Sequence, residues 1–166
     1  MPDVFTKAKR SDVMSRIRSR GNKDTEVALA KLLRANGISG WRRHLLIRAT
    51  VDSSKLIVDS RKRRSKDHQP STRNYQLTVR PDFVFPRSRT AVFVDGCFWH
   101  GCPKHGTQPA GNRTFWKNKF TRNKARDVLV TRTLRRAGWR VLRIWEHELA
   151  CKNATRLLRR IRQALF

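Results

Sequence analysis

The chain has 166 residues, with 39 Lys or Arg against 12 Asp or Glu and a formal net charge of +27 at pH 7. This length suits a single domain, 1–166, with one hydrophobic core and excludes two full-sized domains. A compact chain with this charge repels itself unless a polyanion is present, so nucleic acid is the expected partner. Tryptophans scattered among the basic residues disfavour a disordered cationic chain, while a ribosomal or packaging protein stays an alternative.

The first segment, residues 1–22, is expected to form an N-terminal basic arm. Ser11 can cap a short helix in it, which would either lie on DNA or pack on the domain. A second helix begins near Asp24 or Thr25, carries an apolar leucine stripe, and is ended by Asn36-Gly37 in the manner of a glycine C-cap.

Residues 48–79 lose the hydrophobic pattern and hold a basic run, so we expect a mobile basic insertion there. Its arginines, Arg61 to Arg64, would follow DNA phosphates or have no role. Regular structure is expected to resume with a short strand over 80–85 and a buried strand over 90–94, which can pair as a hairpin across Pro86.

Three further elements complete the chain. Helical spacing begins at Arg113 and continues until Gly138, an alternating strand follows over 139–145, and an amphipathic helix closes the chain over 154–165. This order predicts an α/β fold with α/β/α layers around a small mixed sheet.

Two aspartates flank the expected hairpin. Asp82 stands at the start of one strand and Asp95 at the end of the next, so both carboxylates should lie at one edge of the sheet. Two such groups can hold Mg²⁺ between them, as a phosphodiesterase requires. The alternative is that both aspartates simply cap turns.

The segment from Phe93 to His105 concentrates further reactive side chains. Cys97, Cys102 and His105 supply three of the four ligands of a structural zinc site, and the fourth must come from elsewhere in the chain. Three cysteines in this pattern indicate a metal site in a reducing compartment more than disulfides. Without a signal core at the start or a stretch of about twenty apolar residues, we expect a cytoplasmic, nucleoid-associated prokaryotic protein that contacts no membrane.

Within that segment, His100 suits proton transfer, and an extra zinc ligand or a packed aromatic is the alternative. The neighbouring Phe98 and Trp99 suit stacking on bases, and at least one of them should face DNA.

Two stretches carry a resemblance to a known family: Arg80 to Val84 and Val94 to Cys102. Together with residues 3–46 and the rest of 80–160, they are similar to the very-short-patch (Vsr-type) DNA mismatch endonucleases. That family is a variant of the restriction-endonuclease fold and nicks double-stranded DNA beside the thymine of a T:G mismatch. The resemblance implies the same fold and the same activity for this chain.

The resemblance also implies roles for single residues. Asp82 would be the central Mg²⁺ ligand, His100 the general base or a water-orienting residue, and Glu26 and Asp127 supporting acidic groups near the metal waters. Phe98, Trp99 and Trp116 would intercalate into the duplex, although Trp116 could instead be a core residue of its helix. The fourth zinc ligand would be His147, with Cys151 as the competitor and two free thiols without zinc as the remaining alternative.

The chain departs from the family's familiar form at two positions, where Val94 and Asp95 replace a threonine and a histidine. Asp95 would then be a direct Mg²⁺ ligand. We expect a Mg²⁺-dependent, zinc-stabilised mismatch-nicking enzyme, acting as a monomer with repair-pathway proteins as candidate partners. The rivals are a Vsr-like nuclease of a restriction, defence or homing system and a noncatalytic zinc-containing DNA-binding module.

Overall fold

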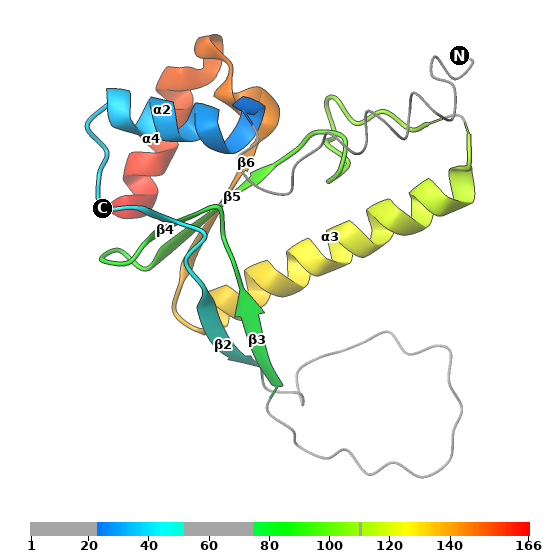
Figure 1. Ribbon diagram of the computed structural model, residues 1–166, viewed down its shortest axis with the longest axis horizontal. Coiled ribbons are helices and arrows are strands. Elements are labelled where there is room, and N and C mark those ends of the chain that lie inside the picture. Colours follow the sequence, from blue (N-terminus) through cyan, green and yellow to red (C-terminus); the bar gives the residue numbers. More distant parts are fainter. Residues whose placement is uncertain (1–22, 52–74, 110) are drawn as a thin grey trace.

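The computed structural model describes residues 23–51, 75–109 and 111–166 (Figure 1). The expected basic arm, 1–22, and the arginine run at 61–64 lie outside these ranges. Within them, no helix has the length and apolar character needed to cross a bilayer.

The central sheet has four strands in the order β1-β4-β5-β6. Its strands are β1 (Arg42–Arg43), β4 (Phe83–Phe85), β5 (Thr90–Asp95) and β6 (Arg140–Trp145). β4 and β5 form the expected antiparallel hairpin, and β6 runs parallel to β5 with Phe93 opposite Arg143 and Asp95 opposite Trp145. The prediction of a small mixed sheet is therefore confirmed.

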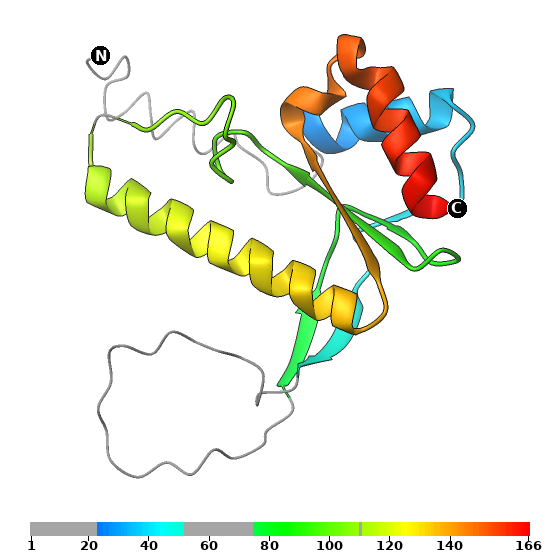
Figure 2. The same ribbon diagram turned by 180° about the vertical axis from the view of Figure 1, so that it is seen from behind.

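Helices cover both faces of this sheet (Figures 1 and 2). They are α2 (Ala28–Ala35), α3 (Arg113–Arg136) and α4 (Ala154–Leu165), with short helical turns η1 (Lys23–Val27), η3 (Glu146–Leu149) and η4 (Cys151–Asn153). On one face, α2 and α4 enclose a core that includes Leu29, Leu33, Phe83, Val92, Ile144, Leu157 and Ile161. On the other face, Val130 and Leu134 of α3 pack with Val84 and Ala91. Consecutive residues of β5 point to opposite cores, which gives the predicted α/β/α layers.

The boundary of α2 follows from its sequence. Its buried leucines lie on one side of the helix, and Asn36 follows its last residue. Gly37 then adopts a φ of +68°, in the left-handed region that favours glycine. The predicted glycine C-cap is confirmed.

The predicted insertion, 48–79, is wrong at both of its ends. β2 (Ile47–Val51) and β3 (Tyr75–Val79) pair as an antiparallel ribbon. Ile47, Ala49 and Val79 are buried in the core beneath α3. These strands are short and lie beside a long basic segment, so only their packing against α3 makes them recognisable.

The long helix α3 has two different halves. Its C-terminal half covers the sheet, while its N-terminal half extends beyond the sheet (Figure 1). There Trp116 and Phe120 pack on Phe98 of the loop that follows β5, with ring centroids 5.2 and 5.5 Å apart. The loop after β5 is therefore anchored to α3.

Candidate active site and metal centres

Asp82 lies directly before β4, next to the end of β5. Its Oδ2 accepts a hydrogen bond of 2.7 Å from the backbone N–H of Val94. Burial raises the pKa of the Asp82 carboxyl to about 6; the Val94 hydrogen bond opposes this rise, and the charge of nearby Glu26 adds to it. A largely buried carboxyl whose pKa is raised in this way is a common feature of functional sites.

Asp82 forms a group with Glu26 and His44, whose candidate ligand atoms all lie within 4.8 Å of one another. Glu26 is buried at the start of the helical segment 23–35 and pairs with the guanidinium of Arg43 and, at 3.0 Å, with Nε2 of His44. We call Glu26, His44 and Asp82 the carboxylate group. The sequence predicted Glu26 and Asp82 as site residues but not Arg43 and His44. These two residues stand in a short basic segment and carry no separate sequence signal.

A second group lies at the end of β5 and is formed by Asp95, His100 and Asp127. His100 Nδ1 is 2.6 Å from Asp127 Oδ2 and 3.6 Å from Asp95 Oδ1. We call these three residues the histidine group. When Nδ1 donates its N–H to Asp127, Nε2 carries no proton, and its lone pair can accept a proton from water.

Arg143 of β6 links the two carboxylates of the histidine group. Its Nε donates to Asp95 Oδ2 at 2.7 Å, and its Nη2 lies 2.8 Å from Asp127 Oδ1. Burial alone would raise the pKa of Asp127, but the hydrogen bond and charge of His100, together with Arg143, lower it. Asp127 is therefore held as an anion against the imidazole.

The two aspartates that the sequence reading placed around one ion fall into two different groups of candidate ligands. Asp95 belongs to the histidine group, and both of its oxygens accept hydrogen bonds from Arg143. Asp82 belongs to the carboxylate group with Glu26. Arg143 had no role in the sequence reading, yet it supplies the charge that balances an aspartate at position 95.

The four predicted zinc ligands, Cys97, Cys102, His105 and His147, lie together, with one ligand atom of each within 4.8 Å of the others. Nδ1 of His147 is 3.3 Å from the Cys97 sulfur and 3.6 Å from the Cys102 sulfur. A tetrahedral zinc with Zn–S of about 2.3 Å and Zn–N of about 2.0–2.1 Å would separate such atoms by about 3.6 Å. Both thiols are buried, so the donor set and its spacing fit a closed structural zinc site. We call these four residues the Cys2His2 group.

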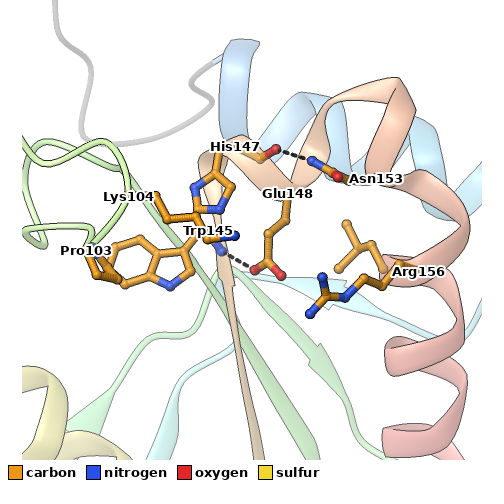
Figure 3. A pocket seen from close by; sticks show the side chains of 8 residues that line it. Pro103, Lys104, Trp145, His147, Glu148, Asn153 and Arg156 are labelled. Carbon is orange, nitrogen blue, oxygen red and sulfur yellow. Dashed lines mark hydrogen bonds between the residues drawn. The ribbon is translucent and has the colours of Figure 1, made fainter.

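The surroundings of His147 fix the position of this candidate ligand, as Figure 3 shows. Asn153 Nδ2 donates to the backbone oxygen of His147 at 2.9 Å, and the Glu148 carboxylate accepts from the backbone N–H of Trp145 at 2.8 Å. The other candidate, Cys151, is exposed and is not part of the Cys2His2 group.

The predicted DNA-contacting rings form one aromatic cluster. Phe98 packs edge-on against Trp99 at 5.1 Å and against Trp116 at 5.2 Å. Trp99 and Trp116 are half-buried, and the backbone oxygen of Trp99 accepts from Asn123 of α3 at 2.8 Å. The cluster thus presents partly exposed rings both from the loop that carries His100 and from α3.

Comparison with known proteins identifies a family that this chain resembles. The family model described as DNA mismatch endonuclease Vsr matches residues 2–46 and 64–105. The second match begins inside the predicted insertion, so residues 64–79 belong to the family sequence and not to an unmatched insert.

Named relatives cover the chain to different extents. The nicking enzyme V.NmeAIP of Neisseria meningitidis is 31% identical over 172 residues, covering 99% of this chain and all of that protein. V.NaeI of Lentzea aerocolonigenes is 57% identical over 72 residues, 43% of each chain. The DNA mismatch endonuclease Vsr of Escherichia coli is 41% identical over 71 residues, 42% of this chain and 46% of that protein.

The alignments with V.NaeI and with V.NmeDIP of Neisseria meningitidis span 43% and 59% of the length of those relatives. All of these relatives are named as nucleases, in agreement with the predicted enzyme class. The family match, which covers more than half of the chain, and the full-length similarity to V.NmeAIP lead to one conclusion: the chain belongs to the Vsr family of DNA mismatch endonucleases.

Proposed function

We propose that the protein is a Mg²⁺-dependent endonuclease with a restriction-endonuclease-like fold that nicks one strand of duplex DNA at T:G mismatches. The observation that carries this proposal is the meeting of the carboxylate group and the histidine group at one end of the sheet. Asp82 contacts the backbone of Val94, and the next residue, Asp95, lies beside His100.

The carboxylate group suits the catalytic metal. Asp82 and Glu26 offer the oxygen ligands that Mg²⁺ prefers, whereas His44 offers nitrogen. When bound, Mg²⁺ would polarise the scissile phosphate and lower the pKa of an attacking water. The protein contributes the orientation: Val94 fixes one oxygen of Asp82, and Arg43 with His44 fixes Glu26.

The histidine group suits general-base chemistry. Asp127 holds the His100 ring through Nδ1, so that Nε2 can take a proton from the attacking water. Arg143 holds Asp127 from the other side and engages Asp95. In this arrangement Asp95 is a positioning residue for His100, which replaces the initial expectation of a direct Mg²⁺ ligand.

The Cys2His2 group suits a structural zinc ion. It joins the loop after β5 to the turn after β6, and the backbone N–H of Cys97 donates to Glu146 at 3.0 Å on the same side. His100, Phe98 and Trp99 lie within that loop. Zinc binding would therefore order both the general base and the aromatic rings, in a domain whose charge weakens its folding.

The aromatic cluster suits recognition of a mismatch. Ring insertion unstacks the duplex at a cost of a few kcal/mol, and this cost is smallest at a mispaired base. Phe98, Trp99 and Trp116 are the rings proposed to enter the duplex. The proposal also includes action as a monomer in the cytoplasm, since one nick needs one active site, with repair-pathway proteins as candidate partners.

A nicking assay on T:G, T:A and C:G duplexes tests the proposal. The protein should nick the T:G duplex in Mg²⁺ and spare both matched duplexes, and Asp82→Asn should abolish nicking while DNA binding persists. Nicking of a matched duplex would contradict mismatch specificity and support the second candidate, a nuclease of a restriction, defence or homing system. The relatives named as Type II nicking enzymes favour that candidate as the alternative. Binding without nicking of any duplex would leave a noncatalytic zinc-containing module.

A further inference from the structure

An open groove of about 620 Å³ lies between α3 and β6, next to the histidine group. Its lining consists of Asp127, Val128, Thr131, Arg132, Arg135 and Arg136 from α3 and Arg143 from β6. We call it the arginine groove. Figure 2 shows α3 and β6, the two elements that form its walls, converging at the C-terminal end of α3.

The charge of the arginine groove is strongly positive. Arg132, Arg135 and Arg136 are exposed, and none of them forms an ion pair with any residue that the structure describes. The one acidic side chain in the lining, Asp127, is already engaged by His100 and Arg143. The three free guanidinium groups therefore have no internal counter-charge in the described part of the chain.

The position of the groove relates it to the site of chemistry. It begins at Asp127, which holds the proposed general base, and follows α3 to Arg136. At about 1.5 Å per helical residue, these nine steps cover about 13.5 Å. Laid parallel to the duplex axis, along which one DNA strand rises by about 3.4 Å per nucleotide, the groove spans about four nucleotides.

We propose that the arginine groove binds the phosphodiester backbone of the nicked strand, on one side of the cleavage position. This proposal rests on the proposed function, because the histidine group defines where the nick lies relative to the groove. Guanidinium groups bind phosphate oxygens as two-pronged donors. The unpaired charges of the lining are guanidinium groups, and it holds no free carboxylate that would repel phosphate, so the occupant we assign to it is the backbone.

A charge-matched pair of triple variants tests this assignment. The groove variant carries Arg132→Gln, Arg135→Gln and Arg136→Gln. The control variant carries Arg156→Gln, Arg159→Gln and Arg162→Gln, three exposed arginines of α4 on the opposite side of the sheet. Both variants lose the same charge, and circular dichroism of the full chain checks that each is folded.

The readout is DNA affinity in Mg²⁺-free buffer at several salt concentrations. Each phosphate contact contributes about 0.9 to the slope of log affinity against log salt, so the groove variant should lose up to about 2.7 from that slope. The control variant should keep nearly the parent slope. Equal slope losses in the two variants would overturn the proposal.

A second measurement locates the contact on the DNA. Neutral methylphosphonate linkages are placed one at a time within four nucleotides of the mismatched thymine, on either side and in either strand. In the strand that contains the thymine, linkages on one side of that thymine should weaken binding of the parent protein. The same linkages should not further weaken binding of the groove variant. Persistence of the same penalties in the groove variant would assign those phosphates elsewhere and leave the groove to another occupant, such as an acidic protein segment.

These binding measurements need no cleavage, so they separate two kinds of failure. A parent protein that shows the groove-dependent salt slope but nicks no duplex would retain the backbone site and refute the proposed catalysis. A parent that nicks T:G duplexes with an unchanged slope in the groove variant would retain the catalysis and refute the backbone site.

Discussion

Replacing Asp82 by asparagine should make the protein more stable at neutral pH in Mg²⁺-free buffer. Burial raises the pKa of this carboxyl from 3.8 to about 6. Below pH 3.8 the carboxyl is protonated in both the folded and the unfolded chain, and its burial then costs no charge penalty. As the pH rises from 3.8 through about 6, the free energy of unfolding falls, because the unfolded chain releases the proton more readily than the folded one. Asparagine keeps an oxygen that can accept the hydrogen bond from Val94, so the substitution removes the charge and little else.

The magnitude follows from the two pKa values. At about 1.4 kcal/mol per tenfold change in proton affinity, an ionised Asp82 costs about 3 kcal/mol at pH 7.5 and about half as much at pH 5. Asp82→Asn should therefore raise the melting temperature at pH 7.5 by about 6–12 °C, and by about half as much at pH 5. Adding Mg²⁺ should stabilise the parent and not the variant, because binding to the folded state compensates for the buried charge.

Thermal and urea denaturation of the zinc-loaded proteins at both pH values measure this effect. Asp127→Asn is the matched control: it makes the same change in net charge, but the pKa of Asp127 is lowered in the folded protein. The control should lose stability at pH 7.5, and its loss should shrink as the pH falls. The reasoning would be refuted if Asp82→Asn were less stable than the parent, or if its gain in stability were the same at pH 5 and at pH 7.5.

Three further outcomes test other parts of the site. Cys102→Ala should lower the bound zinc measured by mass spectrometry and reduce the melting temperature, whereas Cys151→Ala, a change at an exposed thiol, should do neither; equal zinc loss in both would contradict the proposed ligand set. Arg143→Gln should slow single-turnover nicking at saturating DNA by at least about tenfold, because oriented general bases contribute about 10²–10⁴; an unchanged rate would remove its positioning role. Trp116→Ala should reduce the preference for T:G over matched duplexes more than Phe115→Ala does, as measured by competition binding, and equal effects would argue against its insertion.

Parts of the site were predictable because their signal is local. Cys97, Cys102 and His105 stand within one short loop, and their side-chain types are those that zinc prefers. The distant candidate ligand, His147, came from the family resemblance, and the structure places it beside both thiols. Residue spacing alone did not decide between it and Cys151.

Other parts depend on contacts between segments far apart in the chain. Arg143 meets Asp95 across 48 positions because β6 runs parallel to β5 with Phe93 opposite Arg143. Side chains at every second position share a face of the sheet, so this register brings the guanidinium to the carboxylate. A change of one residue in the register would have turned Arg143 to the other face.

The sequence by itself determined the local elements: the helix ended by Gly37, the hairpin around Pro86, the alternating strand β6 and the loop that carries His100. Hydrophobic periodicity, turn residues and metal-ligand spacing act over a few residues, so they can be read directly from the chain. Only the tertiary structure divided the acidic residues into the carboxylate group and the histidine group, and only it made β2 and β3 part of the core. The physical reason is that ion pairs and burial depend on which elements pack together, and the pairing of β5 with β6 and the packing of α3 on the sheet decide that.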